Sequence, residues 1–249
     1  MDLFQGNTLR HHLIELSKSN NITLPKNELL YMMFVIDLCR AVEFLHGMNL
    51  IHRDIKPENI IITQNLEVKL IDFGISKKLS KENQHKNLFT TNCGKGTLIY
   101  FPPENVVNDI HEEDDFLLTQ LSQSRKISKS FDIWTIGLII SEIFGNEIPW
   151  KELVNKGPNF LTIALMNKNK FPIPETIKDE KIIRIIEACT EIYPINRINI
   201  HKLIKKLIEV FVEKLKKYSV NNNVFELFET PKESKHLSLS VNTFFICRL

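Results

Sequence analysis

Apolar residues recur at helical spacing between residues 200 and 215, where the periodicity of this chain is clearest. The intervals alternate between three and one, at Ile200, Leu203, Ile204, Leu207, Ile208, Phe211, Val212 and Leu215. This spacing places one apolar stripe along an α-helix. The lysines between and after these positions are expected to form its solvated face: Lys202, Lys205, Lys206, Lys214, Lys216 and Lys217.

Helical patterns also occupy the amino-terminal part of the chain. A short helix through Leu16 is expected to be capped by Asn7 or Thr8, whose side chains can accept hydrogen bonds from free N–H groups of the first turn. A longer helix is expected from about Asn27 to His46. Its predicted buried face comprises Leu30, Met33, Phe34, Asp37, Leu38, Ala41 and Leu45.

The most apolar stretch covers residues 131–144 and is predicted to be a core helix. It contains two acidic residues, Asp132 and Glu142. It also falls short of the roughly 18 residues that a membrane-spanning helix needs. We therefore expect this helix to lie inside the protein.

Two short β-rich runs, residues 60–62 and 68–71, flank a turn-prone Gln-Asn pair at positions 64 and 65. This arrangement predicts a β-hairpin. The hairpin would return Asp72 to the side of Asn59, and Gly74 would let the backbone leave sharply. Together with the helices, it predicts a mainly α fold with a small β-hairpin element.

The polar residues around this hairpin form a set suited to phosphoryl transfer. That reaction needs an anion to orient the attacking hydroxyl, oxygen ligands for Mg²⁺ and a cation for the moving phosphate. Asp54 would supply the anion and Lys56 the cation, while Asn59 and Asp72 would supply the oxygen ligands. Pro57 denies a continuous helix between Asp54 and Asn59, so these two side chains can converge from one irregular loop.

Five motifs in a fixed order carry a family resemblance. Residues 52–59 read His-Arg-Asp-Ile-Lys-Pro-Glu-Asn, and residues 72–74 read Asp-Phe-Gly. Three further motifs follow: Gly-Thr-Leu-Ile-Tyr-Phe-Pro-Pro-Glu at 96–104, Asp-Ile-Trp-Thr-Ile-Gly at 132–137 and Pro-Ile-Asn-Arg at 194–197. The pattern resembles the large, carboxy-terminal lobe of eukaryotic protein kinases from about residue 3 to about residue 217. Ile55 stands in place of the usual Leu, and Pro102 in place of the usual Ala.

The resemblance implies roles for individual residues. The catalytic residues would be Asp54, Lys56 and Asn59. The cofactors would be ATP, contacted by Lys56, Glu58, Asn59, Ile61 and Asp72, and Mg²⁺, held by Asn59 and Asp72. Glu58 would border the nucleotide through its backbone, and a surface role is an equal alternative. The residue types at Lys56 and Thr97 resemble those of serine/threonine kinases at these motif positions. This implies that the acceptor is a serine or threonine of a protein substrate.

Other residues of these motifs are expected to be structural. His52 and Phe73 would stack in a hydrophobic column anchored by Asp132. Glu104 and Arg197 would form a buried pair that ties the activation segment to the lower helices, and losing one partner would strand a charge at a cost of about 3 to 5 kcal/mol. His46 is expected to be a satisfied histidine at a helix end.

Two long segments depart from the compact plan of the family. Residues 75–95 would form an activation segment in which Thr90 or Thr91, once phosphorylated, would be held by Arg53. Residues 105–130 carry an acidic run at 112–115 that is typical of a solvated loop. We assign that insertion no role.

Composition limits the class of protein. With 249 residues, 43% hydrophobic and 25% charged, the chain is typical of a globular protein. A net charge of +2 gives no electrostatic case for a nucleic-acid partner, and no segment indicates a membrane partner or a signal peptide. Four scattered cysteines, Cys39, Cys93, Cys189 and Cys247, favour a reduced, cytoplasmic compartment, with the nucleus as an alternative.

The first 51 residues contain neither a glycine-rich loop nor a Val-Ala-Ile-Lys strand. In the family these parts cover the ATP phosphates and hold them. We therefore expect residues 1–217 to be a kinase carboxy-terminal lobe that begins just after the hinge, followed by a polar tail at 218–249. Ile61 would remain as a floor for the adenine, and the kinase would be incomplete as given.

Three interpretations stay open at this point. The chain is a serine/threonine kinase lobe that has lost its amino-terminal part, a kinase-like binding or scaffold module, or a lobe completed by another chain. The charged set at Asp54, Lys56, Asn59 and Asp72 favours the first, because a module without catalysis has no physical need to keep it.

Overall fold

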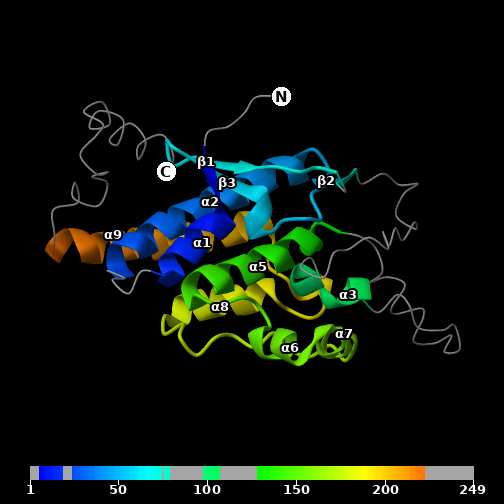
Figure 1. The fold of residues 1–249 in the computed structure, drawn as a ribbon. Coiled ribbons are helices and arrows are strands. Elements are labelled where there is room, and N and C mark those ends of the chain that lie inside the picture. Colours follow the sequence, from blue (N-terminus) through cyan, green and yellow to red (C-terminus); the bar gives the residue numbers. More distant parts are fainter. Residues whose placement is uncertain (1–5, 19–23, 75, 79–97, 107–127, 222–249) are drawn as a thin grey trace, which may run out of the picture.

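The computed structural model describes residues 6–18, 24–74, 76–78, 98–106 and 128–221. Helices make up most of this part, and a small sheet lies beside them (Figure 1). The longer helices are α1 (Leu9–Lys18), α2 (Leu24–Gly47), α5 (Ser130–Gly145), α7 (Pro158–Met166), α8 (Glu180–Cys189) and α9 (Ile200–Asn221). The shorter ones are α3 (Pro103–Val106), α6 (Lys151–Lys156) and the single 3₁₀ turns η1 (Pro57–Asn59), η2 (Leu98–Tyr100) and η4 (Pro194–Asn196). The mainly α expectation is confirmed.

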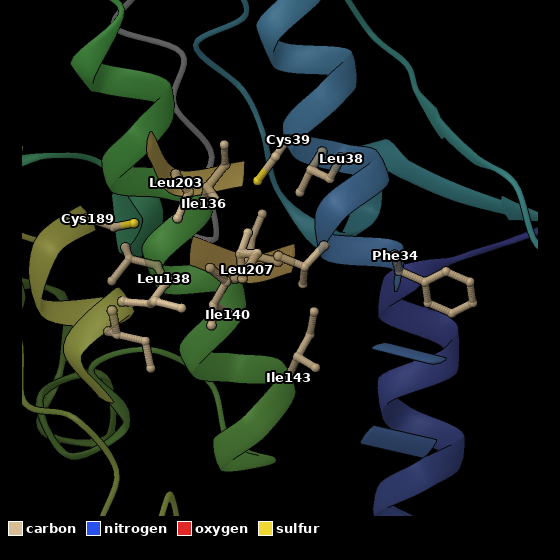
Figure 2. Close-up of a cluster of buried hydrophobic side chains, with 14 of the residues drawn as sticks. Phe34, Leu38, Cys39, Ile136, Leu138, Ile140, Ile143, Cys189, Leu203 and Leu207 are labelled. Carbon is tan, nitrogen blue, oxygen red and sulfur yellow. The ribbon is translucent and has the colours of Figure 1, made fainter. Parts of the chain in front are cut away.

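Helix α5 forms the centre of the core, as its apolar sequence predicted. Nearly every side chain along it is buried, including Trp134, Ile136 and Ile140. Figure 2 shows its residues between Leu38 of α2, Leu207 of α9 and the other labelled side chains of this cluster. A helix that is apolar on all sides is stable in water only when its neighbours cover it on all sides.

Helix α8 approaches α5 closely at Gly137. A Cβ atom at this position would stand 2.5 Å from Cβ of Cys189, which is too close for any side chain. The glycine therefore permits the packing of the two helices. Cys39 and Cys189 are buried, free thiols, and burial raises the pKa of both.

Helix α2 begins at Leu24, earlier than the predicted Asn27. We predicted a single buried face, but the helix is buried on more sides than one. All six residues from Tyr31 to Ile36 are buried. Helices α5 and α9 both pack against it, so its surroundings include more than one neighbour. Among the described residues, no helix is long and apolar enough to cross a membrane.

The predicted hairpin is present, and it gains a third strand. Strand β3 (Ile60–Thr63) pairs antiparallel with β4 (Val68–Leu70), with Ile60 opposite Leu70. Strand β1 (Gly6–Thr8), which the sequence pattern did not indicate, pairs with the other edge of β3. A Cβ atom at position 6 would stand 2.4 Å from the carbonyl oxygen of Ile62, so this close pairing requires glycine. A second small sheet joins β2 (Leu50–Ile51) to β5 (Lys77–Lys78).

Helices α1 and α9 begin where the sequence predicted. Thr8 caps α1, because its Oγ1 accepts the backbone N–H of His11 at 3.2 Å. Helix α9 buries its predicted apolar stripe and runs on to Asn221, past the expected boundary at residue 217. That division into 1–217 and 218–249 stays a prediction, since residues 222–249 lie outside the described part.

One lysine of the α9 face was interpreted wrongly. Lys214 is only partly exposed, and its Nζ contacts Oε1 of Glu28 at 2.8 Å and a carboxylate oxygen of Asp179. It therefore joins α9 to α2 and to the residue that caps α8. Lys202, Lys205, Lys206, Lys216 and Lys217 are exposed, as expected.

The pair between Glu104 and Arg197 is formed as predicted. Both terminal nitrogens of Arg197 donate to the carboxylate, each at 2.6 Å. The guanidinium also lies 4.9 Å from the ring centroid of Trp134. A bidentate pair packed on a core tryptophan holds the segment after residue 98 against the helical lobe.

Candidate active site

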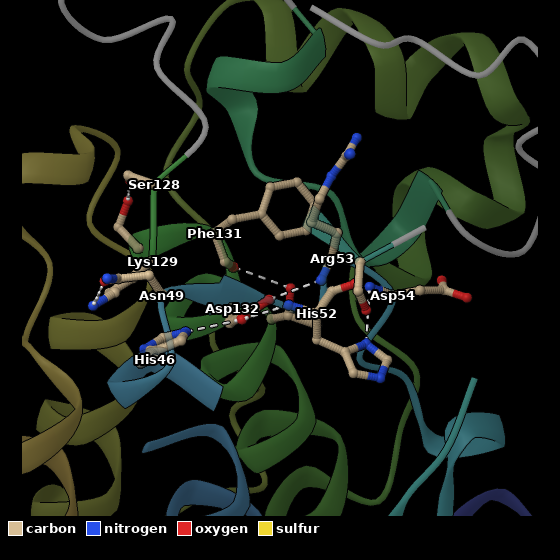
Figure 3. A network of polar contacts seen from close by, with 12 residues as sticks. His46, Asn49, His52, Arg53, Asp54, Ser128, Lys129, Phe131 and Asp132 are labelled. Carbon is tan, nitrogen blue, oxygen red and sulfur yellow. Dashed lines mark hydrogen bonds and ion pairs between the residues drawn. The ribbon is translucent and has the colours of Figure 1, made fainter. Parts of the chain in front are cut away.

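Asp132 of the core helix holds the loop at residues 52–59 in place. Its carboxylate is fully buried and accepts the backbone N–H groups of His52 and Arg53, each at 3.0 Å. It also accepts Nε2 of His46 at 2.9 Å, so His46 is satisfied as predicted (Figure 3). Arg53 has a φ of 71°, a strained conformation for a non-glycine residue. The two hydrogen bonds at His52 and Arg53 help to keep the loop in this shape.

His52 links this loop to the segment that carries Asp72. Its Nδ1 accepts the backbone N–H of Asp54 at 3.3 Å, and its Nε2 donates to the carbonyl of Ile71 at 3.1 Å. The ring centroid lies 4.9 Å from that of Phe73. The expected contact between the two rings is present, with their planes tilted by 59°, but Phe73 is half exposed and not packed in a column. Both bonds require a neutral ring with its proton on Nε2.

Protonation of His52 is expected to destabilise the fold. Burial lowers its pKa below the ordinary 6.5, although Asp132 and the bond to Ile71 act in the opposite direction. The unfolded chain therefore binds more protons than the native protein just below pH 6.5. The contribution of the neutral His52 ring to the free energy of unfolding should be fully present above pH 6.5. It should be lost as the pH falls through the lower pKa of the native protein.

The measurement is urea unfolding as a function of pH for the parent and for His52→Asn, whose amide oxygen can still accept from Asp54. The variant should show a smaller loss of stability below pH 6.5. Other titrating groups, including His12, whose pKa burial also lowers, contribute equally to both proteins. Identical pH profiles would contradict the assignment.

Asp54, Lys56 and Asn59 converge as predicted. Nζ of Lys56 lies 3.0 and 2.8 Å from the two carboxylate oxygens of Asp54. The side-chain amide of Asn59 donates to the backbone oxygen of Asp54 at 2.8 Å and to its Oδ2 at 2.9 Å. Asp54 is mostly buried, with 12% of its side chain exposed, so its orientation is well defined. The loop thus presents a carboxylate and a cation side by side.

The hairpin returns Asp72 to this loop. The backbone N–H of Ile71 donates to the carbonyl of Asn59 at 2.9 Å, which places the next residue beside the cluster. Asp72 is exposed, has a φ of 63°, and accepts the N–H of Gly74 through Oδ1 at 3.1 Å. The left-handed backbone at both Arg53 and Asp72 marks two strained positions in one site.

The oxygen donors fit Mg²⁺ that is shared with phosphates. Asn59 donates through its nitrogen, which leaves its amide oxygen as a ligand, and Asp72 adds a carboxylate. Within the described part of the chain, no three His, Cys, Asp or Glu side chains cluster closely enough to hold a metal ion by themselves. Mg²⁺ commonly takes one or two protein ligands and completes its octahedron with phosphate oxygens and water.

Glu58 directly precedes Asn59, and Ile61 follows it on β3. Ile61 is partly exposed on β3. The carboxylate of Glu58 accepts Nε of Arg10 at 2.7 Å, so its side chain makes an ion pair that the sequence did not reveal. Arg10 also contacts Glu142, a residue 132 positions away. No local pattern could have indicated a pair so distant in sequence.

Several predicted features lie outside the described residues. These are the phosphorylation sites Thr90 and Thr91, the acceptor-type residue Thr97, the acidic run at 112–115, and Cys93 and Cys247. They stay predictions.

A buried aspartate of a central helix thus fixes a loop that carries an anion, a cation and the amide oxygen of Asn59, and the hairpin brings the carboxylate of Asp72 to this loop. These are the kinds of group that phosphoryl transfer requires. The model of the protein kinase domain family matches residues 1–208. The chain therefore belongs to the protein kinase family, whose members generally use ATP and Mg²⁺.

Kinases from several organisms are similar to this chain. An Aurora kinase of Debaryomyces hansenii is 30% identical over 182 residues, which cover 72% of this chain and 37% of the relative. The 3-phosphoinositide-dependent protein kinase B of Dictyostelium discoideum is 29% identical over 171 residues, or 68% of this chain and 16% of the relative. The human 3-phosphoinositide-dependent protein kinase 1 is 31% identical over 142 residues, or 57% and 21%. The matched part spans well under half the length of each relative.

Proposed function

We propose that this chain carries the catalytic loop of a serine/threonine protein kinase, which transfers the γ-phosphate of ATP to a hydroxyl of a protein substrate. The observation that carries the proposal is the cluster of Asp54, Lys56 and Asn59 on a loop held by Asp132. Serine or threonine as the acceptor rests on the resemblance at Lys56 and Thr97.

Each residue of the cluster has a distinct role in this proposal. Asp54 orients the attacking hydroxyl and accepts its proton. Lys56 lies 2.8 Å from Asp54 and neutralises charge on the transferred phosphate. Asn59 and Asp72 hold Mg²⁺, which when bound neutralises charge on the phosphate oxygens. Ile61 contacts the adenine, and Glu58 borders the nucleotide through its backbone.

The test is an assay of ATP binding and phosphate transfer. Residues 1–249 contain no glycine-rich loop, so the chain is assayed both as it stands and joined, ahead of residue 1, to the glycine-rich lobe of a kinase. The joined protein should bind ATP only with Mg²⁺ and label a serine or threonine peptide with radioactive phosphate. Absence of transfer in a folded, joined protein would refute the proposal.

Changing Asp72 to Asn is expected to remove the Mg²⁺-dependent part of ATP binding. The reason is that a neutral amide is a poorer ligand than a carboxylate for displacing water from Mg²⁺. The measurement is calorimetry on the joined protein with and without Mg²⁺. Glu67→Gln at the exposed end of the same hairpin is the matched control and should bind like the parent. Equal ATP affinity with and without Mg²⁺ in the parent would rule out this metal site.

A second candidate function is a kinase-like binding or scaffold module. The observation that favours it is the apolar surface beside the site, where Phe73 is half exposed and Ile61 and Ile71 are partly exposed. Surfaces of this kind mark interfaces. Two results together would favour this candidate. The chain would form a stable complex with another protein that Phe73→Ser abolishes, and the joined protein would not bind ATP.

We also propose a reduced, cytoplasmic location. It is supported by Cys39 and Cys189, which are both free thiols in the core. Fractionation of cells that express a tagged protein would test this assignment.

A further inference from the structure

A pocket of about 420 Å³ is lined by His46, the residue that donates to Asp132, and has no part in the chemistry described above. It lies where the end of α2 meets the starts of α5 and α9 and the turn η4. Its volume is within the range of roughly 300 to 1,000 Å³ that is typical of small-molecule sites. The apolar part of its wall consists of Ile133, Pro194, Ile198 and Ile200.

The charged side chains that line this pocket already have partners. Arg197 makes the bidentate pair with a carboxylate described above. Nδ1 of His201 contacts Oε1 of Glu43 at 2.5 Å, and Nζ of Lys129 donates to the side chain of Asn49 at 3.1 Å. A charged ligand would have to compete with these partners, so the pocket favours a neutral ligand.

His46 gives the pocket one polar atom without a partner. Only 5% of its side chain is exposed, and its Nε2 donates to Asp132 at 2.9 Å (Figure 3). Its Nδ1, on another edge of the ring, makes no hydrogen bond within the described part of the chain. Because the proton of the neutral ring lies on Nε2, Nδ1 carries a free lone pair. An N–H or O–H donor is the chemical complement of that lone pair.

We propose that this pocket is a regulatory site for a compact, neutral, largely apolar ligand that donates one N–H or O–H hydrogen bond to Nδ1 of His46. A donor at Nδ1 stabilises the tautomer whose proton lies on Nε2, which is the form that donates to Asp132. Asp132 in turn holds the catalytic loop. Ligand binding and anchoring of the loop are therefore coupled, and each strengthens the other. The consequence for catalysis rests on the proposed kinase function.

The first experiment compares indole with benzofuran as ligands. The two molecules have nearly the same shape, but only indole has an N–H donor. Nuclear magnetic resonance of residues 1–249, with histidine labelled by nitrogen-15, follows both ring nitrogens of His46 during titration. Indole should bind about three- to tenfold more tightly than benzofuran, as expected for one net hydrogen bond, and should shift the Nδ1 signal. Equal affinities, or an unchanged Nδ1 signal, would overturn the proposal.

Substitutions locate the binding site. His46→Gln keeps an amide N–H for Asp132 but lacks Nδ1, so it should bind indole no more tightly than benzofuran. Ile198→Trp enlarges a side chain of the wall and should weaken binding of both molecules. Ile195→Trp is the matched control, because Ile195 on η4 is 92% exposed and is not part of the wall, and it should bind like the parent.

Two outcomes of this series would contradict the assignment. A preference for indole that persists in His46→Gln would show that the donor bonds to another atom. Binding by Ile198→Trp that equals that of Ile195→Trp would place the ligand outside this pocket. The second comparison decides the site even if His46→Gln does not fold.

The coupling to the catalytic loop is measured by hydrogen exchange at the backbone N–H groups of His52 and Arg53, which donate to Asp132. At about nine times its Kd, indole should slow this exchange about tenfold, since a ligand that binds only the anchored loop makes its opening rarer by the factor 1 + [L]/Kd. Benzofuran at equal occupancy should slow it less. Unchanged exchange with indole bound would overturn the regulatory role. Neither measurement needs phosphate transfer, so failure of the kinase function would leave both tests of the pocket intact.

Discussion

Replacing Asp54 by alanine is expected to lower phosphate transfer to a protein substrate by about 10²- to 10⁴-fold, the range for loss of a positioned general base. The carboxylate lies within 3.0 Å of Lys56 and accepts a hydrogen bond from Asn59, so the loop holds it in a defined orientation. The measurement is radioactive phosphate transfer by the joined protein. Circular dichroism should show an unchanged fold, because the backbone bonds of the loop go to Asp132.

The matched control is Glu67→Ala, which removes a carboxylate that pairs with Lys69 on the same hairpin, away from the catalytic loop. This variant should transfer phosphate at the parent rate. Transfer by Asp54→Ala near the parent rate would show that the base is wrongly assigned.

Replacing Asp132 by alanine is expected to reduce the free energy of unfolding by about 3 to 5 kcal/mol. The substitution strands the buried N–H of His52, the buried Nε2 proton of His46 and the partly buried N–H of Arg53. Each buried donor without a partner costs about 1 to 3 kcal/mol. Loss of the anchor should also release the strained backbone at Arg53.

Urea unfolding followed by circular dichroism measures this loss. Ser141→Ala on the same helix is the control, because the buried Ser141 hydroxyl makes no hydrogen bond among the described residues and its removal should leave stability nearly unchanged. Asp132→Asn keeps one acceptor oxygen and should lose less than Asp132→Ala. Equal stability of Asp132→Ala and Ser141→Ala would contradict the anchoring role.

The elements predicted best were those whose hydrogen bonds join neighbours in sequence. The hairpin of β3 and β4 and the helices α5 and α9 each follow from periodicity and turn residues within one short segment. The pairing of β1 with β3 was missed, because Gly6 and Thr63 are brought opposite each other by the intervening helices. A strand of three residues has too little pattern to predict such a partner.

Exposure was predicted less well than element type. Lys214 shares its spacing with the exposed lysines of α9, yet it meets Glu28 of α2 and Asp179, which caps α8. Periodicity states which face of a helix is apolar, but it does not state what approaches the opposite face. The same reason explains why α2 is buried on nearly all sides from Tyr31 to Ile36.

The sequence by itself determined which residues form the candidate site. Asp54, Lys56, Asn59 and Asp72 could be named because their types and spacing are local properties of two loops and a hairpin. Tertiary structure alone decided how Asp132 orients the loop and how Arg10 comes to lie between Glu58 and Glu142. The physical reason is that hydrogen bonds and ion pairs act over a few ångströms in space, and only packing of the helices brings together residues that are far apart along the chain.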